Sequence, residues 1–400
     1  KRRRRQGAMG RAKVARRHLG LSSAATERYG AMADTTVATA NRVQQWADDE
    51  FYEYVRGNLF KPYMGKGENS IIQVKEELTK QSGDRITFSL VSRLTGNGVT
   101  NDATLEGNEE ALDNFGHLVT VNQLRNGVVV GAYEKIRTKI DLLNAAKIML
   151  RVWNMEQLRD LFIARLLSPT TNGLTTYAAA TEVQKDAWEV ANNPAGTNQR
   201  ILFGAAKANS TGDHSAGLTT IDGTADDMHQ DIVRLARRLA QSCDPHIRPI
   251  VPMDGSEAGS ERYVLFAGSI PFRDLEANFD TLRSNADVRG DKNSIFSGAD
   301  LKIGNVIVHE LPELDDLNTA GGSTLANVGD GGTVEVQGTF LCGAQALLLA
   351  WAQRMQIKTD EFDYQNRRGV SISEIRGCEK STYNSFQHGV VTVYVSAVGD

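Results

Sequence analysis

Three residues early in the sequence, Gly65, Lys66 and Gly67, have types that can cradle a phosphate group. A P-loop places four residues between its first glycine and a Gly-Lys-Ser/Thr sequence, so that backbone N–H groups surround the phosphate and the hydroxyl group binds magnesium. Here Glu68 follows Gly67, and Ser70 stands where a dinucleotide-binding fingerprint has its third glycine. The spacing therefore favours a turn over a phosphate site.

Two further groups of residues have types that bind metal ions. Cys243 and His246 have ligand-like spacing, but two ligands do not make a zinc site, and Cys342 and Cys378 lie far away in the sequence. The second group lies at a predicted helix N-terminus, where the helix dipole favours acids. Its members are Asp226, Asp227, His229 and Asp231. Helical spacing puts them on different sides of the first turn, so we expect neither group to bind a metal.

The sequence contains no recognisable catalytic motif. It lacks a Gly-x-Ser-x-Gly elbow, a His-Glu-x-x-His helix, a Cys-x-x-Cys pair and a Walker sequence. The histidines lie in separate segments, which favours structural roles. They include His117, His214, His229, His246, His309 and His388. Catalytic triads can assemble from distant segments, so the absence only lowers the expectation of an enzyme. We expect a protein that is not an enzyme and that uses no cofactor or metal.

A long polar segment separates two predicted strands. About 25 residues, rich in Gly, Asn and acids, lie between "RITFSL" at 85–90 and "HLVTVNQL" at 117–124. Loops of this length without a core of their own are usually functional or disordered. The charged residues give a net charge of −4: Arg93, Asp102, Glu106, Glu109, Glu110 and Asp113. They lack the ligand order of an EF-hand, so we expect a two-stranded arm that needs a neighbouring surface.

Charge is distributed unevenly along the chain. Residues 1–31 have a net charge of +9, whereas the other 369 residues hold 35 basic and 48 acidic side chains, a net of −13. A basic arm on an acidic body is typical of contact with nucleic acid. The candidate contacts are Arg2, Arg3, Arg4 and Arg5. A second interpretation stays open, because "MADTTVATANRVQQWADDEF" from Met32 resembles a natural start, which would make 1–31 an upstream extension, a processed segment or sequence that is not native.

The remaining patterns predict an α+β protein with a large core. Apolar residues at helical spacing predict a helix of about 50 Å over 136–168. A helix over 41–60 would bury aromatic side chains, including Trp46 and Phe51, against another surface. The apolar run 340–352 is too short to span a bilayer, which favours a core helix over 340–354. Further helices are predicted from Thr224 and over 272–279, and strands over 263–268, 304–311 and 389–398.

The cysteines and the N-terminal composition indicate the cellular compartment of the protein. The three cysteines are an odd number far apart in the sequence, which fits a reduced, intracellular environment for assembly. The basic N-terminus is not followed by the apolar segment of a secretory signal. We therefore expect no association with a membrane.

One region closely resembles a known family. Residues 64–112, "MGKGENSIIQVKEELTKQSGDRITFSLVSRLTGNGVTNDATLEGNEEAL", resemble the signature region of major capsid proteins from tailed bacteriophages of the N-four-like group. "LCGAQALLLAW" at 341–351 is similar too, while residues 1–31 lie outside the resemblance. The resemblance implies the Hong Kong 97-type fold, with an N-terminal arm, an extended β-hairpin loop, a peripheral domain crossed by a long spine helix, and an axial domain. The implied boundaries are 1–31 for the basic extension, 32–82 for the arm, 83–132 for the loop and its strands, 133–222 for the peripheral domain, 223–345 for the axial domain, and 346–400 for the return to the peripheral domain.

The resemblance implies a structural function. Copies would self-assemble as pentamers and hexamers into an icosahedral shell that encloses a double-stranded DNA phage genome. Scaffolding protein, portal and decoration proteins would be partners, with DNA on the inner face and no membrane. The protein would belong to the virion capsid and assemble in the cytoplasm of the bacterial host. Two alternatives are an encapsulin-like compartment and a DNA-binding protein that uses the basic arm.

The predicted contacts between subunits involve charged loop residues and two aromatic residues. They are Arg93, Asp102, Glu106, Glu109, Glu110, Trp46 and Phe51. We hypothesise that the acidic loop meets a basic surface on a neighbouring copy, such as the Arg side of the 136–168 helix. Charge reversal at Glu109 and Glu110 should then impair particle yield without unfolding the subunit.

Overall fold

The computed structural model describes residues 58–76, 83–102, 104–138, 140–169, 175–194, 198–251, 260–286, 301–315 and 323–399. All of them belong to one of two units of the chain, Phe51–Asp400. The predicted helix over 41–60 therefore lies almost wholly outside the described residues. The same holds for six predicted contact residues: Trp46, Phe51, Arg2, Arg3, Arg4 and Arg5.

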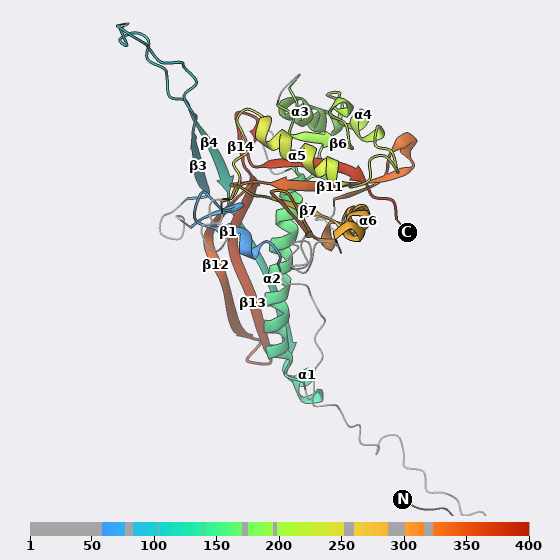
Figure 1. The fold of residues 1–400 in the computed structure, drawn as a ribbon. Coiled ribbons are helices and arrows are strands. Elements are labelled where there is room, and N and C mark those ends of the chain that lie inside the picture. Colours follow the sequence, from blue (N-terminus) through green and yellow to red (C-terminus); the bar gives the residue numbers. More distant parts are fainter. Residues whose placement is uncertain are drawn as a thin grey trace, which may run out of the picture. The chain divides into compact units, whose positions relative to one another are not determined.

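The first sheet is built around two long antiparallel strands, β12 and β13 (Figure 1). Its strand order is β1-β2-β12-β13-β5, and β2 runs parallel to both β1 and β12. The strands are β1 (Met64–Gly65), β2 (Ile72–Lys75), β5 (Asn122–Gly131), β12 (Leu347–Phe362) and β13 (Arg367–Lys380). Residues from three distant parts of the sequence thus meet in one sheet.

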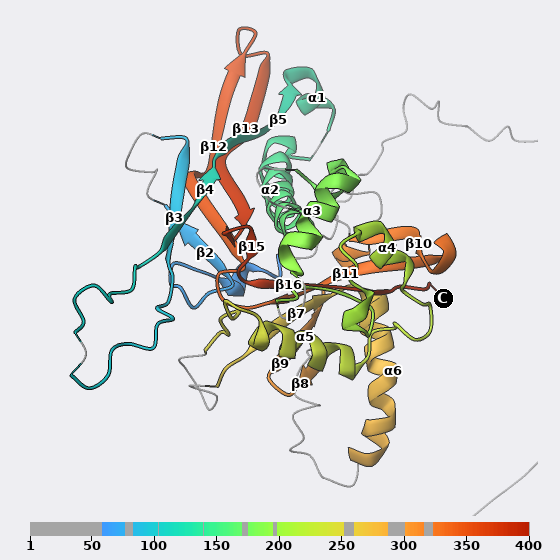
Figure 2. The same ribbon diagram turned by 90° about the horizontal axis from the view of Figure 1, so that it is seen from above.

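The long helix α2 (Leu142–Leu167) lies along this sheet (Figure 2). The carboxylate of Asp141 caps its N-terminus by accepting a hydrogen bond from the Asn144 N–H group. Leu150 packs against Val370 and Ile372 of β13. The predicted 136–168 helix is confirmed in this element, which is shorter, at about 39 Å. A separate helix, α1 (Ala132–Arg137), precedes it, because residue 138 is extended.

The second sheet mixes parallel and antiparallel strands in the order β6-β16-β11-β7-β9-β8, and β10 pairs with β11. The strands are β6 (Ile201–Phe203), β7 (Tyr263–Ala267), β8 (Leu301–Ile303), β9 (Val306–Glu310), β10 (Thr324–Gly329), β11 (Val334–Cys342) and β16 (Val390–Ser396). The predicted strands at 263–268, 304–311 and 389–398 are confirmed as β7, β9 and β16. Two short strands, β14 (Thr382–Tyr383) and β15 (Phe386–Gln387), form a separate pair.

Both faces of the second sheet are covered. On β16, Val391, Val393 and Val395 belong to a core with the helix α5, whereas Val390 and Tyr394 belong to a core with the end of α2. The remaining helices are α3 (Glu182–Asn192), α4 (His214–Thr219), α5 (Gln230–Ser242) and α6 (Ser269–Ala286). A strand that is buried on both faces has a continuous apolar run and no alternation, as "VVTVYVS" has.

The predicted helix over 340–354 is wrong. Residues 340–342 end β11, and β12 begins at Leu347. Leu347 to Ala350 pair with both β2 and β13, and the four side chains are almost completely buried. An apolar run that is buried on all sides carries no helical or strand period, so its composition alone favours neither structure.

Two other helix predictions need smaller corrections. The helix predicted to begin at Thr224 begins at Gln230, because the Asp222 carboxylate holds the N–H groups of Thr224 and Ala225 in a turn. The helix predicted over 272–279 is part of the longer α6. Within the described ranges, no helix is long and apolar enough to cross a bilayer.

Candidate functional site

The predicted two-stranded arm is present as β3 (Arg85–Val91) and β4 (Asn114–Thr120), paired antiparallel along their whole length. Its base is fixed to the first sheet. Ile86, Phe88 and Val119 share a small core with Leu348 and Ala350 of β12. The ribbon is therefore anchored at one end, and residues 92–113 connect its strands at the other.

The loop at 92–113 is organised by its own hydrogen bonds. The Glu110 carboxylate accepts from the N–H groups of Thr95, at 2.6 Å, and Gly96, at 2.7 Å. These bonds lower the pKa of Glu110. Glu109 Oε2 accepts from the Gly107 N–H group at 2.8 Å. Glu110 thus joins the two sides of its own loop, and its role in a contact between subunits stays a prediction.

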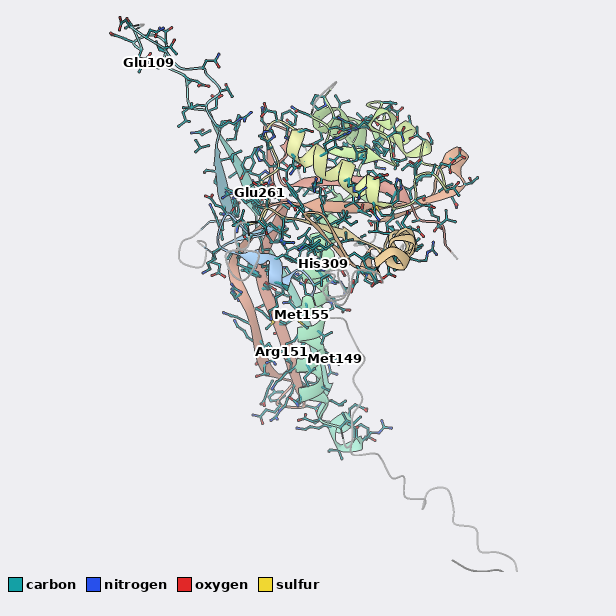
Figure 3. The ribbon with its side chains drawn as sticks, in the orientation of Figure 1. Glu109, Met149, Arg151, Met155, Glu261 and His309 are labelled. Atoms are coloured by element: carbon teal, nitrogen blue, oxygen red, sulfur yellow. The ribbon has the colours of Figure 1, made fainter. Side chains whose placement is uncertain are left out.

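Arg93 also contacts its own chain. Its Nη2 atom lies 2.8 Å from Asp244 Oδ1, and both side chains are more than half exposed. Asp102 and Glu106 are exposed. Glu109 lies at the outer end of the loop, directed away from α2, on which Arg151 and Met155 lie (Figure 3). The structure thus gathers the predicted loop acids on one exposed segment.

Large apolar side chains are also exposed on this segment. Leu94, Leu105 and Leu112 each expose about 60% of their surface. A second exposed apolar group lies where α1 meets the β12–β13 turn, near the hydrogen bond from Ala132 N–H to the Asn366 carbonyl. It comprises Val129, Tyr133, Ile136, Phe362 and Tyr364. Exposed apolar groups of this kind often mark surfaces that contact another protein.

The residues that suggested phosphate binding form an ion-paired turn. The Ser70 hydroxyl group donates to the Gly67 carbonyl at 2.6 Å, which closes the turn. Lys66 Nζ lies 3.3 Å from Glu76 Oε2. The lysine is therefore paired with a carboxylate of its own chain, and the segment forms the predicted turn.

The predicted metal-type residues have separate structural partners. The buried Cys243 thiol donates to the carbonyls of Ala240 and Pro245, and His246 is exposed. Asp226 accepts from the N–H groups of Ala205 and Asp222, and Asp227 accepts from the Ser396 hydroxyl group. Within the described ranges, no group of three or more His, Cys, Asp or Glu side chains could hold a metal ion.

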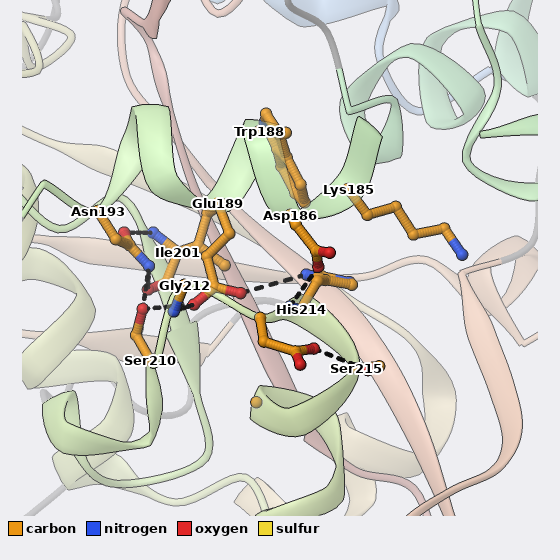
Figure 4. A network of polar contacts seen from close by, with 12 residues as sticks. Lys185, Asp186, Trp188, Glu189, Asn193, Ile201, Ser210, Gly212, His214 and Ser215 are labelled. Carbon is orange, nitrogen blue, oxygen red and sulfur yellow. Dashed lines mark hydrogen bonds and ion pairs between the residues drawn. The ribbon is translucent and has the colours of Figure 1, made fainter. Parts of the chain in front are cut away.

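A buried polar network links α3 to α4 (Figure 4). Glu189 and His214 are completely buried, and Glu189 Oε2 lies 3.8 Å from His214 Nδ1. The Ser210 hydroxyl group donates to Glu189 Oε1 at 2.7 Å, and Tyr177 Oη lies 2.8 Å from His214 Nε2. Burial lowers the pKa of His214 to about 4, and Lys185 adds to the effect. This network fixes two helices on the second sheet, and its members are too far apart in the sequence for any motif to reveal it.

A second buried network surrounds Lys380, which is fully buried on β13. Its Nζ atom donates to Gln387 Oε1 at 3.2 Å and lies 5.1 Å from the centre of the Trp188 ring. Burial lowers the pKa of Lys380 to about 7. Arg200 donates to the Gln387 carbonyl at 2.8 Å. These groups are enclosed by protein and are therefore not accessible to a substrate.

Comparison with known proteins identifies the family. A family model described as "Phage capsid protein" matches residues 34–398. The major capsid protein of Pseudomonas phage KPP25 is 28% identical over 365 residues, which cover 87% of this chain and 93% of that protein. The solved capsid of cyanophage Pam1 is 35% identical with a TM-score of 0.81, covering 92% of this chain and 100% of that chain. The capsid of Ralstonia phage GP4 is 22% identical with a TM-score of 0.67, covering 92% and 99%.

The chain therefore belongs to the phage capsid protein family. Its fold is the α+β, Hong Kong 97-type fold of phage capsids. Its function is that of a major capsid protein, the structural subunit of an icosahedral phage shell, so it is part of the virion. The resemblance to phage major capsid proteins is confirmed. These comparisons support neither an encapsulin-like compartment nor a DNA-binding protein, and the N-four-like grouping stays a prediction.

Proposed function

We propose that copies of this chain form pentamers and hexamers in which the 92–113 loop of one copy lies on the next copy. The observation that carries the proposal is the exposure of Leu94, Leu105 and Leu112 on a loop whose two-stranded ribbon is fixed to the first sheet at its base. A two-stranded ribbon is marginally stable alone, and it gains stability by packing on another surface. Many such weak contacts, closed by symmetry, give a stable shell.

We propose the domain division given by the sequence, with one change. The arm would extend to residue 82, and the ribbon and β5 would form the 83–132 unit. The peripheral domain would comprise 133–222 and 346–400 apart from β6 and β16, and so would contain α2 and the strands β12 and β13. The axial domain would also include β6 and β16, since both strands pair within the second sheet.

We further propose that the shell encloses double-stranded DNA and is assembled in the bacterial cytoplasm with scaffolding, portal and decoration proteins. Outside residues 1–31 the chain has a net charge of −13. Phosphate groups bind strongly to basic surfaces, so an acidic container does not retain the DNA that it must release. This role requires no catalytic chemistry of the subunit.

The test is electron microscopy of the purified protein, together with a variant in which Leu94, Leu105 and Leu112 are replaced by serine. We expect the parent to form shells, tubes or flat capsomer arrays, and the variant to remain folded but unassembled. Val183→Ser on α3 is the matched control, because that side chain is also exposed but lies on another element. Full assembly of the triple variant would refute the role of the loop, and small uniform particles from the parent would count against self-assembly.

The charge-reversal test needs a different pair of residues from the one chosen on the sequence. Reversing Glu110 would break its bonds to Thr95 and Gly96, so a lower particle yield would report a damaged loop. Glu106 makes no bond across the loop in the described structure, and Glu109 accepts only a local bond from the Gly107 N–H group, so reversing these two residues tests the contact between subunits.

A further inference from the structure

Asparagine followed by glycine is a reactive pair, because glycine has no Cβ to hinder its backbone nitrogen from reaching the asparagine side chain. The chain has three such pairs, at 97–98, 126–127 and 172–173, and the structure describes the first two. Both of these pairs are followed by a valine, so their local sequences are similar. The folded surroundings therefore decide which of the two reacts.

The pair at 97–98 lies in the 92–113 loop. Asn97 and Gly98 are both exposed, and neither belongs to a helix or a strand. Gly98 has a φ of +68°, and a Cβ added there would meet no atom within 4 Å. The Gly98 nitrogen can therefore turn toward the Asn97 amide group without displacing another residue.

The pair at 126–127 is also exposed, but it lies inside β5, where it is paired with Ile372 and Ser371 of β13. The Gly127 N–H group donates to Asn126 Oδ1 at 2.8 Å. A donor to a carbonyl oxygen lies near the plane of the amide group, whereas attack on the carbon requires approach from outside that plane. Gly127 can turn into that position only when part of the ladder opens, and local opening costs free energy.

The Glu110 carboxylate lies beside the exposed pair. It accepts from the N–H groups of Thr95, at 2.6 Å, and Gly96, at 2.7 Å. A Cβ added at Gly96 would lie 2.7 Å from Glu110 Oε2, so the carboxylate approaches this backbone closely. A negative charge created at residue 97 would therefore arise next to the carboxylate that joins the two sides of the loop, and like charges repel.

We propose that Asn97 deamidates spontaneously and that the carboxylate it forms loosens the hold of Glu110 on the 92–113 loop. The Gly98 nitrogen gives its proton to water or hydroxide and attacks Asn97 Cγ. The Cγ–Nδ2 bond breaks, and the amide nitrogen takes up one proton and leaves as ammonia. One water molecule then opens the five-membered succinimide ring, which yields aspartate or isoaspartate at residue 97.

The reaction consumes one water molecule and releases one ammonia molecule, so it needs neither an oxidant nor a second enzyme. It changes the net charge of the 92–113 loop from −4 to −5. Because the reaction occurs within one unassembled copy, the inference goes beyond the proposed function and does not depend on the contact between copies. It makes the charge of the loop a property that changes with the age of the subunit.

The first experiment is a time course on the purified full-length protein in mildly alkaline and mildly acidic buffer, followed by digestion and mass spectrometry. The peptide that contains Asn97 should gain the mass difference between a hydroxyl and an amino group, faster in the alkaline buffer. It should also separate into an aspartyl and an isoaspartyl form. The peptide that contains Asn126 should react at least about tenfold more slowly, the effect of about 1.4 kcal/mol in a barrier.

The matched control is the same protein unfolded in urea, because both pairs then lack structure and should react at similar rates. Unmodified Asn97 in the folded protein after the alkaline time course would overturn the proposal. Equal rates at Asn97 and Asn126 in the folded protein would overturn it as well, because the ladder would then not distinguish the two pairs.

The second experiment tests the loosening of the loop with Asn97→Asp, which supplies the charge without the time course. The N–H groups of Thr95 and Gly96 should lose protection against hydrogen exchange, and added salt should restore part of it because salt screens exposed charges. Asn126→Asp, the same change outside the loop, is the matched control and should leave exchange in the loop as in the parent. Parent-like exchange in Asn97→Asp, or a loss of protection that salt does not change, would overturn the loosening.

Discussion

Acid should destabilise the unassembled subunit through His214. This side chain is completely buried, and burial lowers its pKa from the ordinary value of 6.5 to about 4. Between these two pH values the unfolded chain binds a proton that the folded chain does not, so stability falls as pH decreases. The slope of about 1.4 kcal/mol per pH unit applies only between pH 6.5 and pH 4, so the whole loss from pH 7 to pH 4 is about 3 kcal/mol. Well above pH 6.5 the residue is neutral in both states and makes no pH-dependent contribution.

The groups around the imidazole ring act in both directions. Lys185 lowers the pKa of His214, whereas Glu182 and Asp213 raise it. Glu189 Oε2, 3.8 Å from Nδ1, would also attract the protonated ring. The aromatic rings of Tyr177, Trp188, Phe203 and Tyr394 surround it and offer no compensating charge. About 3 kcal/mol is therefore the upper limit of the loss.

The assay is urea unfolding of parent and His214→Gln subunits at pH 7, 5.5 and 4. The variant should be less stable at pH 7, because it loses the packing of the ring, but it should lose about 3 kcal/mol less on acidification. His246→Gln is the matched control, because that side chain is exposed. Equal losses for parent and His214→Gln would refute the reasoning and would mean that other groups dominate acid unfolding.

Two further predictions concern the core. Gly377→Ala should cost about 1–3 kcal/mol in urea unfolding, because the new Cβ would collide with the Thr120 carbonyl. Gly67→Ala, with no close atom near its Cβ, should cost less than Gly377→Ala, and equal costs would contradict the steric argument. The unfolding free energy of Lys380→Met minus that of the parent should be larger at pH 7 than at pH 10.5. Burial lowers the pKa of Lys380 from 10.5 to about 7, so between these pH values the unfolded parent binds a proton that the folded parent does not, and the parent becomes more stable as pH rises. This difference in unfolding free energy should decrease by about 4 kcal/mol from pH 7 to pH 10.5, and a difference that does not change with pH would contradict the lowered pKa of Lys380.

The helices and strands that can be predicted from the sequence have either a periodic pattern of apolar residues or clear boundaries. Helix α2 has apolar residues at helical spacing, and a proline follows its C-terminal Ser168. The strand β3 alternates buried Ile86 and Phe88 with exposed neighbours. The fully buried β7 and β16 were recognised because their apolar runs are short and have β-branched or aromatic residues.

The rest depends on contacts between distant segments. The start of β12 is a strand because β2 and β13 provide hydrogen-bonding partners, and the leucines and alanines of that run have no strong preference for strands. The Glu110 bonds to Thr95 and Gly96 need the ribbon to bring two sides of a loop together. Arg165 is one of many basic residues in the sequence, and only the folded chain shows that its Nε and Nη1 atoms are buried without a hydrogen bond among the described residues.

Folding and assembly depend on different residues of this subunit. The described core is filled by side chains from both sheets, and polar members such as Glu189 and Lys380 make hydrogen bonds within the chain. The exposed leucines of the loop and the apolar group around Ile136 add nothing to that core. Substitutions at these exposed sites should therefore change assembly while the free energy of unfolding stays nearly constant. In contrast, core changes such as Gly377→Ala should lower assembly only through the loss of folded subunits.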